Sequence, residues 1–261
     1  MNIGLDNTRG ITIKSSRELD LMREAGKIIA EAKSAVKAAI APGVTSLEMD
    51  ALAEEIIVKR GATPSFKGYR PAPTMPSFPA TICFSYNEEI VHGIPGNRKM
   101  IEGDIVSIDF GAIVEGFHGD SAFTAGVGNV SDQAQDLMNA TEESLNKGIE
   151  KALAGSRLTN ISNAVQKYSE SKGYSVVREY VGHGIGRSLH EEPQVPNYGE
   201  PGKGPVLKVG MVLAIEPMLN IGTWKTKILK DGWTIVTDDG ELSAHFEHTV
   251  AITENGPEIL T

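Results

Sequence analysis

The stretch "EGDIVSIDFGAIVEGFHGDSAFTAGVG" (residues 102–128) predicts two strands joined by a hairpin loop at Glu115–Gly116. With those two residues in the loop, Gly111 lies opposite Asp120, and Asp109 shares a face with Asp120. Side chains alternate along a strand, so the two aspartates become diagonal neighbours. Two like charges placed in this way repel each other and raise the pKa of one of them, unless a cation lies between them. The hairpin therefore indicates a cation site.

The alternative interpretation of this hairpin is a solvated face whose aspartates point into water. Apolar residues on both faces argue against it, because a half-exposed strand alternates apolar and polar residues. These apolar residues are Ile105, Val106, Ile108 and Phe110. A carboxylate buried without a partner is very costly, so we expect each aspartate to have one.

A similar arrangement returns in the second half of the chain. The segments EGDIVSID (102–109) and VGMVLAIE (209–216) each combine a glycine turn, an apolar strand and a final carboxylate, with glycine and carboxylate at the same spacing. Two expected helices precede each segment. These expected helices are 15–43, 47–61, 132–155 and 159–174. We predict an α+β fold with two related halves, about 13–128 and 129–261, after a tail of residues 1–12.

Capping boxes mark the first two of these helices. Ser15 has Glu18 three residues later, and Thr45 has Glu48 three residues later. In a capping box each side chain satisfies a backbone N–H at the start of the helix. We therefore expect helices to begin at both positions.

The composition is that of a soluble globular chain. It has 261 residues, a formal net charge of −9 and a single cysteine, which excludes an intrachain disulfide and is compatible with a reducing cytosol. The acidic balance argues against nonspecific nucleic-acid binding. We find neither an apolar run of about 18 residues nor a signal peptide, so we expect a cytoplasmic protein with no membrane partner.

Two further carboxylates and a histidine stand out. Glu216 ends an apolar strand directly before Pro217, and Glu247 sits within another mostly apolar strand. Taken singly, Glu216 fits a surface position and Glu247 a cross-strand salt bridge. His183 lies between Gly182 and Gly184, residues that would weaken a helix. Four carboxylates and this imidazole together favour one shared site.

Seven motifs, in register over nearly the whole chain from about Ile13, resemble those of methionine aminopeptidases of type I, which have the pita-bread fold. The motifs are HGIP (92–95), DFG (109–111), GFHGDSA (116–122), GHGIGRSLHEEP (182–193), AIEPM (214–218), DGWT (231–234) and SAHFEHT (243–249). The resemblance implies two pseudo-symmetric halves with an antiparallel sheet core and helices outside. It also implies removal of the N-terminal methionine from nascent proteins and peptides, with a small second residue favoured.

The resemblance implies a set of five metal ligands. They are Asp109, Asp120, His183, Glu216 and Glu247. Together they would hold two divalent ions, which the sequence limits only to Co, Mn, Fe(II) or Zn. In this view the glycines beside His183 let the backbone turn tightly next to the ions.

The resemblance also assigns the catalytic side chains. A metal-activated water would attack the carbonyl of the first residue, with Glu216 relaying its proton as a candidate general base. His190 would donate to that carbonyl, and His92 would contact the amide nitrogen that is cleaved. Considered alone, His190 fits equally well a surface histidine beside two glutamates.

For the methionine side chain, the resemblance suggests a pocket with apolar walls. Its candidates are Cys83, Phe78, Trp233 and, less directly, Tyr69. The proline-rich loop 66–79 leaves open which of Tyr69, Met75 or Phe78 lines the pocket, and it also fits a rigid cover.

Three other histidines receive lesser roles. We expect His118 at the rim or behind the ligands, His245 at the cavity mouth or packed, and His248 in the core or behind the ligands.

The expected partners are N-terminal methionine peptides and nascent chains, bound by a monomer. Lys225, Lys227 and Lys230 form a basic loop in an acidic chain. This loop suggests contact with ribosomal RNA, although an ordinary solvated loop explains it equally well. The rival functions are a Xaa-Pro peptidase of the same fold, such as prolidase or aminopeptidase P, and a noncatalytic binding protein that has lost its metals.

Overall fold

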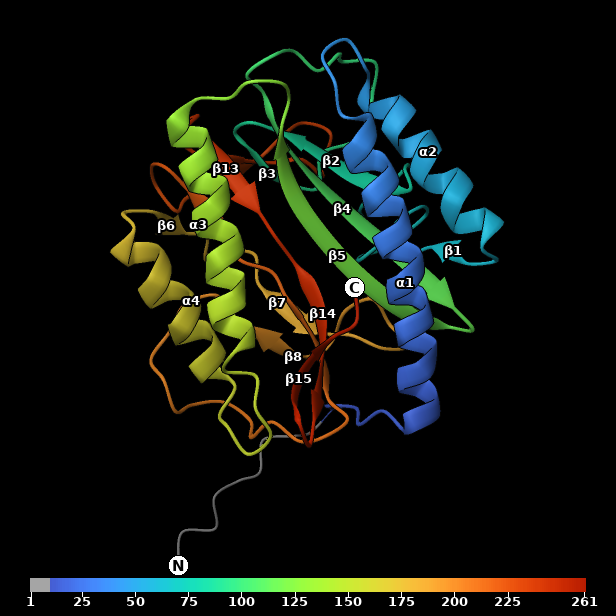
Figure 1. Ribbon diagram of the computed structural model, residues 1–261, viewed down its shortest axis with the longest axis vertical. Helices are drawn as coiled ribbons and strands as arrows, with labels where there is room; N and C mark the ends of the chain where they lie inside the picture. Colours follow the sequence, from blue (N-terminus) through green and yellow to red (C-terminus); the bar gives the residue numbers. More distant parts are fainter. Residues whose placement is uncertain (1–9) are drawn as a thin grey trace, which may run out of the picture.

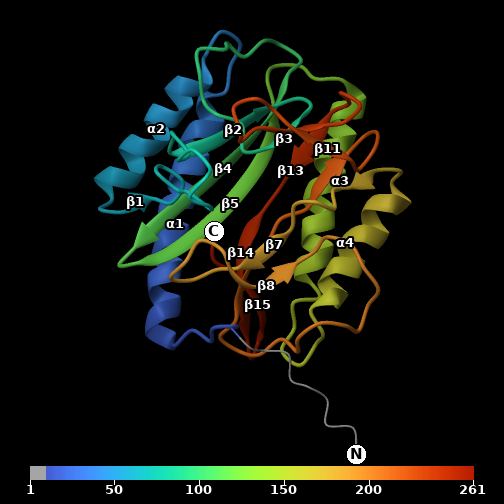
Figure 2. The ribbon, with the colours of Figure 1, turned by 180° about the vertical axis from the view of Figure 1, so that it is seen from behind.

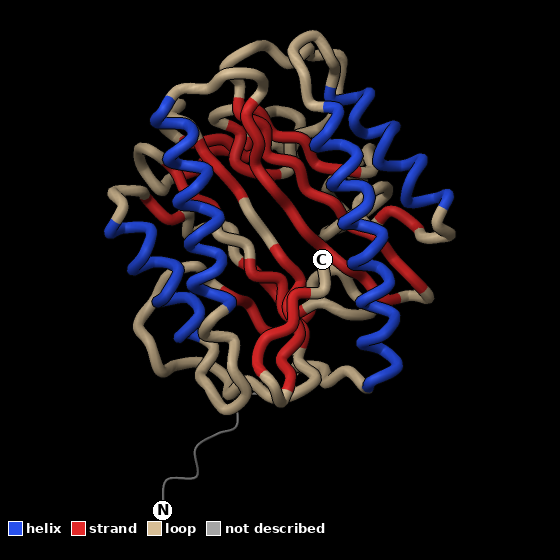
Figure 3. Tube along the Cα trace, in the orientation of Figure 1, coloured by secondary structure: helices blue, strands red, loops and turns tan. Residues whose placement is uncertain are grey.

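The computed structural model describes residues 10–261, and these residues form an α+β fold with antiparallel sheets. In Figure 1 the helix pair α1 and α2 and the pair α3 and α4 lie in front of the strands on opposite sides of the molecule. Turned by 180° in Figure 2, the strands face the viewer and the helices lie behind them. The tube in Figure 3 shows the strands running between the two helix pairs. The predicted fold class, with helices outside an antiparallel core, is confirmed.

Four helices and fifteen strands make up the described part of the chain. The helices are α1 Ser16–Ala39, α2 Ser46–Lys59, α3 Asp132–Ile149 and α4 Thr159–Ser171. The strands of the first half are β1 Thr63–Pro64, β2 Ile82–Tyr86, β3 Glu89–Val91, β4 Ile105–Val114 and β5 Phe117–Gly126. The strands of the second half are β6 Ser175–Val176, β7 Gly182–Gly184, β8 Glu191–Val195, β9 Val212–Ile215, β10 Met218–Asn220, β11 Thr226–Ile228, β12 Ile235–Thr237, β13 Ser243–His245, β14 His248–Thr253 and β15 Gly256–Ile259.

Both predicted capping boxes are present. The Ser15 and Thr45 hydroxyls accept from the backbone N–H of Glu18 and Glu48, and each glutamate accepts from the backbone N–H of its capping residue. These bonds fix where α1 and α2 begin, and therefore how the two helices leave the loops before them.

The β4–β5 hairpin has the register that the sequence predicts. Glu115 and Gly116 form its loop, both with left-handed φ angles of 47° and 82°. Gly111 pairs with Asp120, and Asp109 pairs with Ala122. The two aspartates are thus diagonal neighbours on one face, as the alternation of side chains requires.

In the second half, strand β9 is the counterpart of β4. Strand β9 lies in a five-stranded sheet in the order β15-β14-β9-β7-β8. Strand β4 lies in a four-stranded sheet, where it pairs with β1, β2 and β5. Gly103 and Gly210, which precede the two strands, have nearly equal φ angles of 93° and 88°. The repeated segments predicted a glycine turn before each strand, and both turns are present in the structure.

The two sheets meet along a seam between β5 and residues 247–249. The Thr249 hydroxyl donates to the carbonyl of Asp120 at 2.8 Å and accepts from its N–H at 3.0 Å. The Ser121 hydroxyl donates to the carbonyl of Glu247 at 2.7 Å, and the N–H of Glu247 donates to the carbonyl of Ala122 at 3.0 Å. The seam fixes the backbone of two predicted ligands, one from each half.

Three predictions need correction or limits here. Glu247 does not lie within a strand, because it occupies the break between β13 and β14. Residues 1–9 of the predicted tail lie outside the described residues, and Ile11 pairs with Glu192 in an isolated parallel bridge. The boundary between halves near residue 128 falls in the loop between β5 and α3 and stays a prediction.

Within residues 10–261, we find no helix with the length and apolar character needed to cross a membrane.

Two glycines mark places where helix α1 lies very close to neighbouring segments. A Cβ atom on Gly26 would lie 1.8 Å from the backbone oxygen of Leu260, and one on Gly119 of β5 would lie 3.1 Å from the Cδ1 atom of Ile29. Only glycine allows this approach, which brings the helix down onto the sheet.

We expect Gly26→Ala to lower the free energy of unfolding by about 1–3 kcal/mol, because the added methyl meets backbone that cannot move aside cheaply. The gain in helix propensity, about 1 kcal/mol, does not offset this. Urea denaturation measures the change.

The matched control is Gly148→Ala in α3, where the new methyl would meet the Cγ2 atom of Val165 at 2.8 Å rather than backbone. A side chain can shift, so this variant should lose less stability. If Gly26→Ala were as stable as the wild type, the close approach of α1 would be contradicted.

Candidate active site

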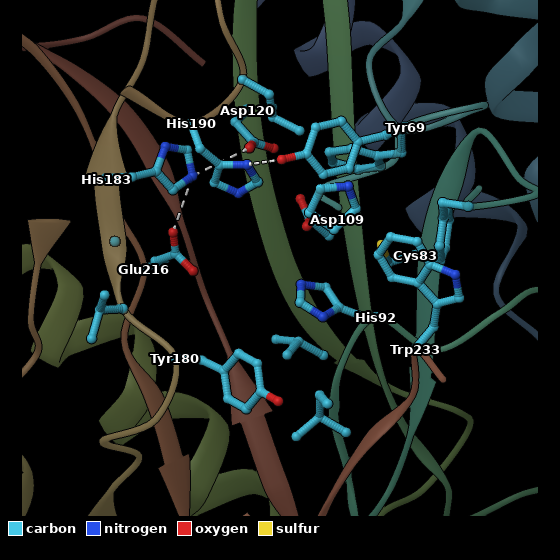
Figure 4. Close-up of a pocket in the computed structure, with 18 of the residues that line it drawn as sticks. Tyr69, Cys83, His92, Asp109, Asp120, Tyr180, His183, His190, Glu216 and Trp233 are labelled. Carbon is cyan, nitrogen blue, oxygen red and sulfur yellow. Dashed lines mark hydrogen bonds and ion pairs between the residues drawn. The ribbon is translucent and has the colours of Figure 1, made fainter. Parts of the chain in front are cut away.

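All predicted site residues line one cavity of about 780 Å³. Figure 4 shows side chains from both halves pointing into it. The lining residues include the five predicted metal ligands, the two histidines predicted to be catalytic and the four predicted pocket residues. The sequence therefore predicted the membership of this cavity well, while the roles of the individual residues stay predictions.

The five candidate ligands come from strands of both halves. Asp109 lies in β4 and Asp120 in β5, while His183 lies in β7. Glu216 directly follows β9, and Glu247 lies between β13 and β14. No two of them are adjacent in sequence, so their convergence is a product of the fold.

Distances between these side chains are short. The Nε2 atom of His183 lies 3.4 Å from an Oε1 atom of Glu216 and 3.9 Å from an Oδ2 atom of Asp120 (Figure 4). One ligand atom from each of Asp120, His183 and Glu247 lies within 4.8 Å of the others. A single ion could contact all three of these groups.

The hydrogen bond of His183 defines which of its nitrogens is free. Its Nδ1 atom lies 2.9 Å from the carbonyl oxygen of Gly184, which can only accept, so Nδ1 carries the proton. Burial lowers the pKa of His183 to about 3, so the ring is neutral at pH 7. Its Nε2 atom then presents a bare lone pair to two carboxylates. That is the state in which imidazole binds a metal.

Burial also governs the four carboxylates. Desolvation raises the pKa of Asp109 to about 6. It raises the pKa values of Asp120, Glu216 and Glu247 well above their usual range, and neighbouring carboxylates raise them further. Four such groups facing one another are unfavourable unless cations compensate them.

Unpaired oxygens provide an independent test of whether metal ions fit this cluster. The Oδ1 atoms of Asp109 and Asp120 and the Oε1 atom of Glu247 are buried and have no hydrogen-bond partner. Buried polar atoms without partners are rare in folded proteins and call for an explanation such as an ion. An oxygen-rich set with one imidazole suits divalent metals of the first transition row. The residues fit a metal centre.

The glycines around His183 were expected to allow a tight turn of the backbone next to the ions, but the structure shows a different role for them. They do not form a tight turn, because Gly182 and Gly184 belong to strand β7. A Cβ on Gly182 would lie 2.4 Å from the carbonyl oxygen of Ala214, and one on Gly184 would lie 2.2 Å from that of Glu192. Glycine is needed here because the backbones on both sides approach too closely for a side chain.

His92 enters the cavity from a strained backbone. Its φ angle is 61°, a left-handed conformation that costs a histidine about 1–2 kcal/mol. Its ring lies edge-on to Tyr180 and Trp233, at centroid distances of 5.8 and 6.3 Å. Burial lowers its pKa to about 4, so the ring is neutral at pH 7. Strain of this kind collects at functional positions.

His190 lies beside the predicted ligands at the exposed edge of the cavity. Its ring centroid is 4.3 Å from that of His183, and its Nδ1 atom is 2.7 Å from the Tyr69 hydroxyl (Figure 4). The interpretation of His190 as a plain surface histidine does not explain this placement.

The apolar wall contains every predicted pocket residue. Phe78 meets Trp233 edge-to-face at 5.2 Å, and Cys83 is buried in the same cluster. Tyr69 and Met75 of the proline-rich loop both line the cavity, so the loop contributes more than a cover.

Several lining residues were missed by the sequence reasoning. They include Phe66, Leu189 and Tyr180. Leu189 directly precedes His190, and Tyr180 lies three residues before His183. Their nearness to the histidines was the one signal in the sequence that could have placed them in the cavity. Phe66 is the first residue of the proline-rich loop 66–79, so its place at the edge of that loop was the available signal.

The remaining histidines lie outside the ligand set. His118 pairs through Nδ1 with the Ser65 hydroxyl at 3.0 Å, and His248 pairs with the Thr261 hydroxyl at 3.0 Å. His245 is 2% exposed, and its Nε2 atom has no hydrogen-bond partner.

Known proteins resemble the chain over nearly its full length. Residues 20–254 match the profile of metallopeptidase family M24. The chain is 57% identical to a methionine aminopeptidase of Clostridium perfringens, covering 96% of this chain and 98% of the relative. It is also 57% identical to methionine aminopeptidase 1 of Bacillus subtilis, covering 96% and 99%.

Solved structures agree with these relatives. The crystal structure of a methionine aminopeptidase from Thermotoga maritima superposes with a TM-score of 0.92 at 48% identity, covering 96% of this chain and 99% of that one. A prolidase from Pyrococcus furiosus superposes with a TM-score of 0.75 at 25% identity, and the chain covers 66% of its length. The predicted pita-bread fold is confirmed, and the chain belongs to metallopeptidase family M24.

Proposed function

We propose that the protein is a methionine aminopeptidase, which removes the N-terminal methionine from peptides and nascent chains. The observation that carries this conclusion is the meeting of four carboxylates and one neutral imidazole in a cavity with an apolar wall, with Asp120, His183 and Glu247 close enough to share an ion. Methionine aminopeptidases that match from end to end support the same assignment.

The metal centre would use Asp109, Asp120, His183, Glu216 and Glu247 as ligands. Their unpaired buried oxygens and the bare Nε2 atom of His183 support this set. Two divalent ions bound there supply Lewis-acid chemistry, since they activate water at neutral pH and polarise the substrate carbonyl.

The side chains around this centre would orient the substrate and move the proton of the attacking water. When the Tyr69 hydroxyl donates to Nδ1 of His190, the neutral ring keeps its proton on Nε2 and can donate to the scissile carbonyl. Glu216 would accept the proton of the attacking water and relay it to the leaving amine. His92 would contact the amide nitrogen of the bond that breaks.

The apolar wall would bind the methionine side chain. Phe78, Trp233 and Cys83 offer a slot without charge, and Tyr69 borders it. An unbranched thioether fits such a slot because it is flexible and polarizable. We expect a small second residue, which stays a prediction.

Neither rival function is favoured. The prolidase relative is less similar and extends well beyond the region that matches this chain. A noncatalytic binding protein would not need to keep five ligands and both histidines in one cavity.

A substrate comparison tests the activity directly. The metal-loaded protein should release methionine from Met-Ala-Ser and leave a Xaa-Pro peptide intact, measured by chromatography of the products. Cleavage of the proline peptide alone would indicate the Xaa-Pro peptidase, and cleavage of neither would indicate the binding protein.

Substitution of one ligand tests the metal centre. Asp120→Asn keeps the shape but removes the charge, so kcat/KM for Met-Ala-Ser should fall by more than about 100-fold and metal binding should weaken. Removal of metal with a chelator should abolish turnover, and added metal should restore it.

The control for that variant is Asp136→Asn, an isosteric change on the exposed face of α3. It should leave turnover and metal content unchanged. Full turnover of Asp120→Asn would contradict the proposed ligand set.

Contact with the ribosome remains a hypothesis about partners, as does the monomeric state. Lys225, Lys227 and Lys230 are exposed around β11, but Lys227 already pairs with Asp238 at 2.7 Å. Reversal of all three charges should weaken cosedimentation with ribosomes if the loop binds RNA. Unchanged cosedimentation would indicate a solvated loop.

A further inference from the structure

Lys33 of helix α1 reaches the sheet from the side opposite the cavity. Its ammonium nitrogen lies 2.6 Å from the hydroxyl of Ser121 in β5. The reach follows from the tight packing at Gly26, two helical turns earlier, and at Gly119, two residues before Ser121. This lysine plays no part in the proposed reaction.

Ser121 links this lysine to the seam behind the metal centre. Its hydroxyl accepts from Lys33 and donates to the backbone carbonyl of Glu247 at 2.7 Å. Side chains alternate along β5, so Asp120 points into the cavity while Ser121 points toward the helix. Lys33 thus lies directly behind the two candidate ligands that the seam holds.

The charge of Lys33 acts on the carboxylate cluster. It lowers the pKa values of Asp109 and Glu247, against the larger effect of burial. Burial lowers the pKa of Lys33 itself to about 8. The other charged or titratable groups near it are Lys37, Glu142 and His248.

The position of this cation matters because the cluster has four carboxylates and two proposed dications. A fixed ammonium attracts the carboxylates equally with and without metal, but it repels the ions that enter between them. This repulsion opposes metal binding, and it is stronger in a buried site than in open water.

We propose that Lys33 is a built-in counter-charge of the carboxylate cluster, which competes with the divalent ions and weakens their binding. It is a positioning residue that acts through space and through Ser121, without touching the substrate. The proposal rests on the proposed metal centre.

The test is calorimetric titration of the metal-free, full-length protein with Mn²⁺. Lys33→Met should bind Mn²⁺ about three- to tenfold more tightly than the wild type, because the competing charge is gone. Lys33→Arg, which keeps the charge, should bind with wild-type affinity. Lys33→Gln provides a second neutral variant if Lys33→Met does not fold, as judged by circular dichroism.

The matched control is Lys37→Met, one turn further along α1. Lys37 is exposed, and its ammonium lies 5.5 Å from the centre of the Phe123 ring. Solvent screens its charge, so its removal should leave Mn²⁺ affinity unchanged.

The outcomes separate the two proposals. Mn²⁺ binding by the wild type, lost in Asp120→Asn, establishes the metal centre independently of Lys33. Equal or weaker binding by the neutral Lys33 variants would overturn the counter-charge, since a purely structural role of this lysine predicts weaker binding on its removal.

Discussion

The seam between β5 and residues 247–249 is the contact on which the site depends. Its hydrogen bonds join the halves and place Asp120 and Glu247, both buried, against each other. Like charges in such a place oppose folding unless cations compensate them. The protein thus uses the stability of its two sheets to hold an arrangement that its carboxylates alone would not adopt.

Local patterns in the sequence were enough for the hairpin and the helix starts. The register of β4 and β5 followed from the loop at Glu115–Gly116 and the alternation of side chains, and both capping boxes formed as expected. These features depend on residues a few positions apart. The residues alone favoured a shared site for four carboxylates and His183, and their assignment as ligands of two metal ions came from the resemblance.

Features that depend on contacts between residues far apart in the chain could not be predicted from the sequence. The break that places Glu247 between β13 and β14 carries no glycine or proline. The glycines beside His183 respond to neighbouring backbones from β8 and β9, which no local pattern reveals. Phe66, Tyr69, Met75 and Phe78 of the proline-rich loop all reach the cavity, a selection that the sequence of the loop does not show. Each of these is a tertiary effect.

The distribution of the ligands over both halves has a consequence for how such a centre can arise. Asp109 and Asp120 come from the first half, and the other three candidates come from the second. Each half carries only part of the donor set for two ions. A protein of half this length would therefore need a second subunit to supply the remaining donors across a shared axis.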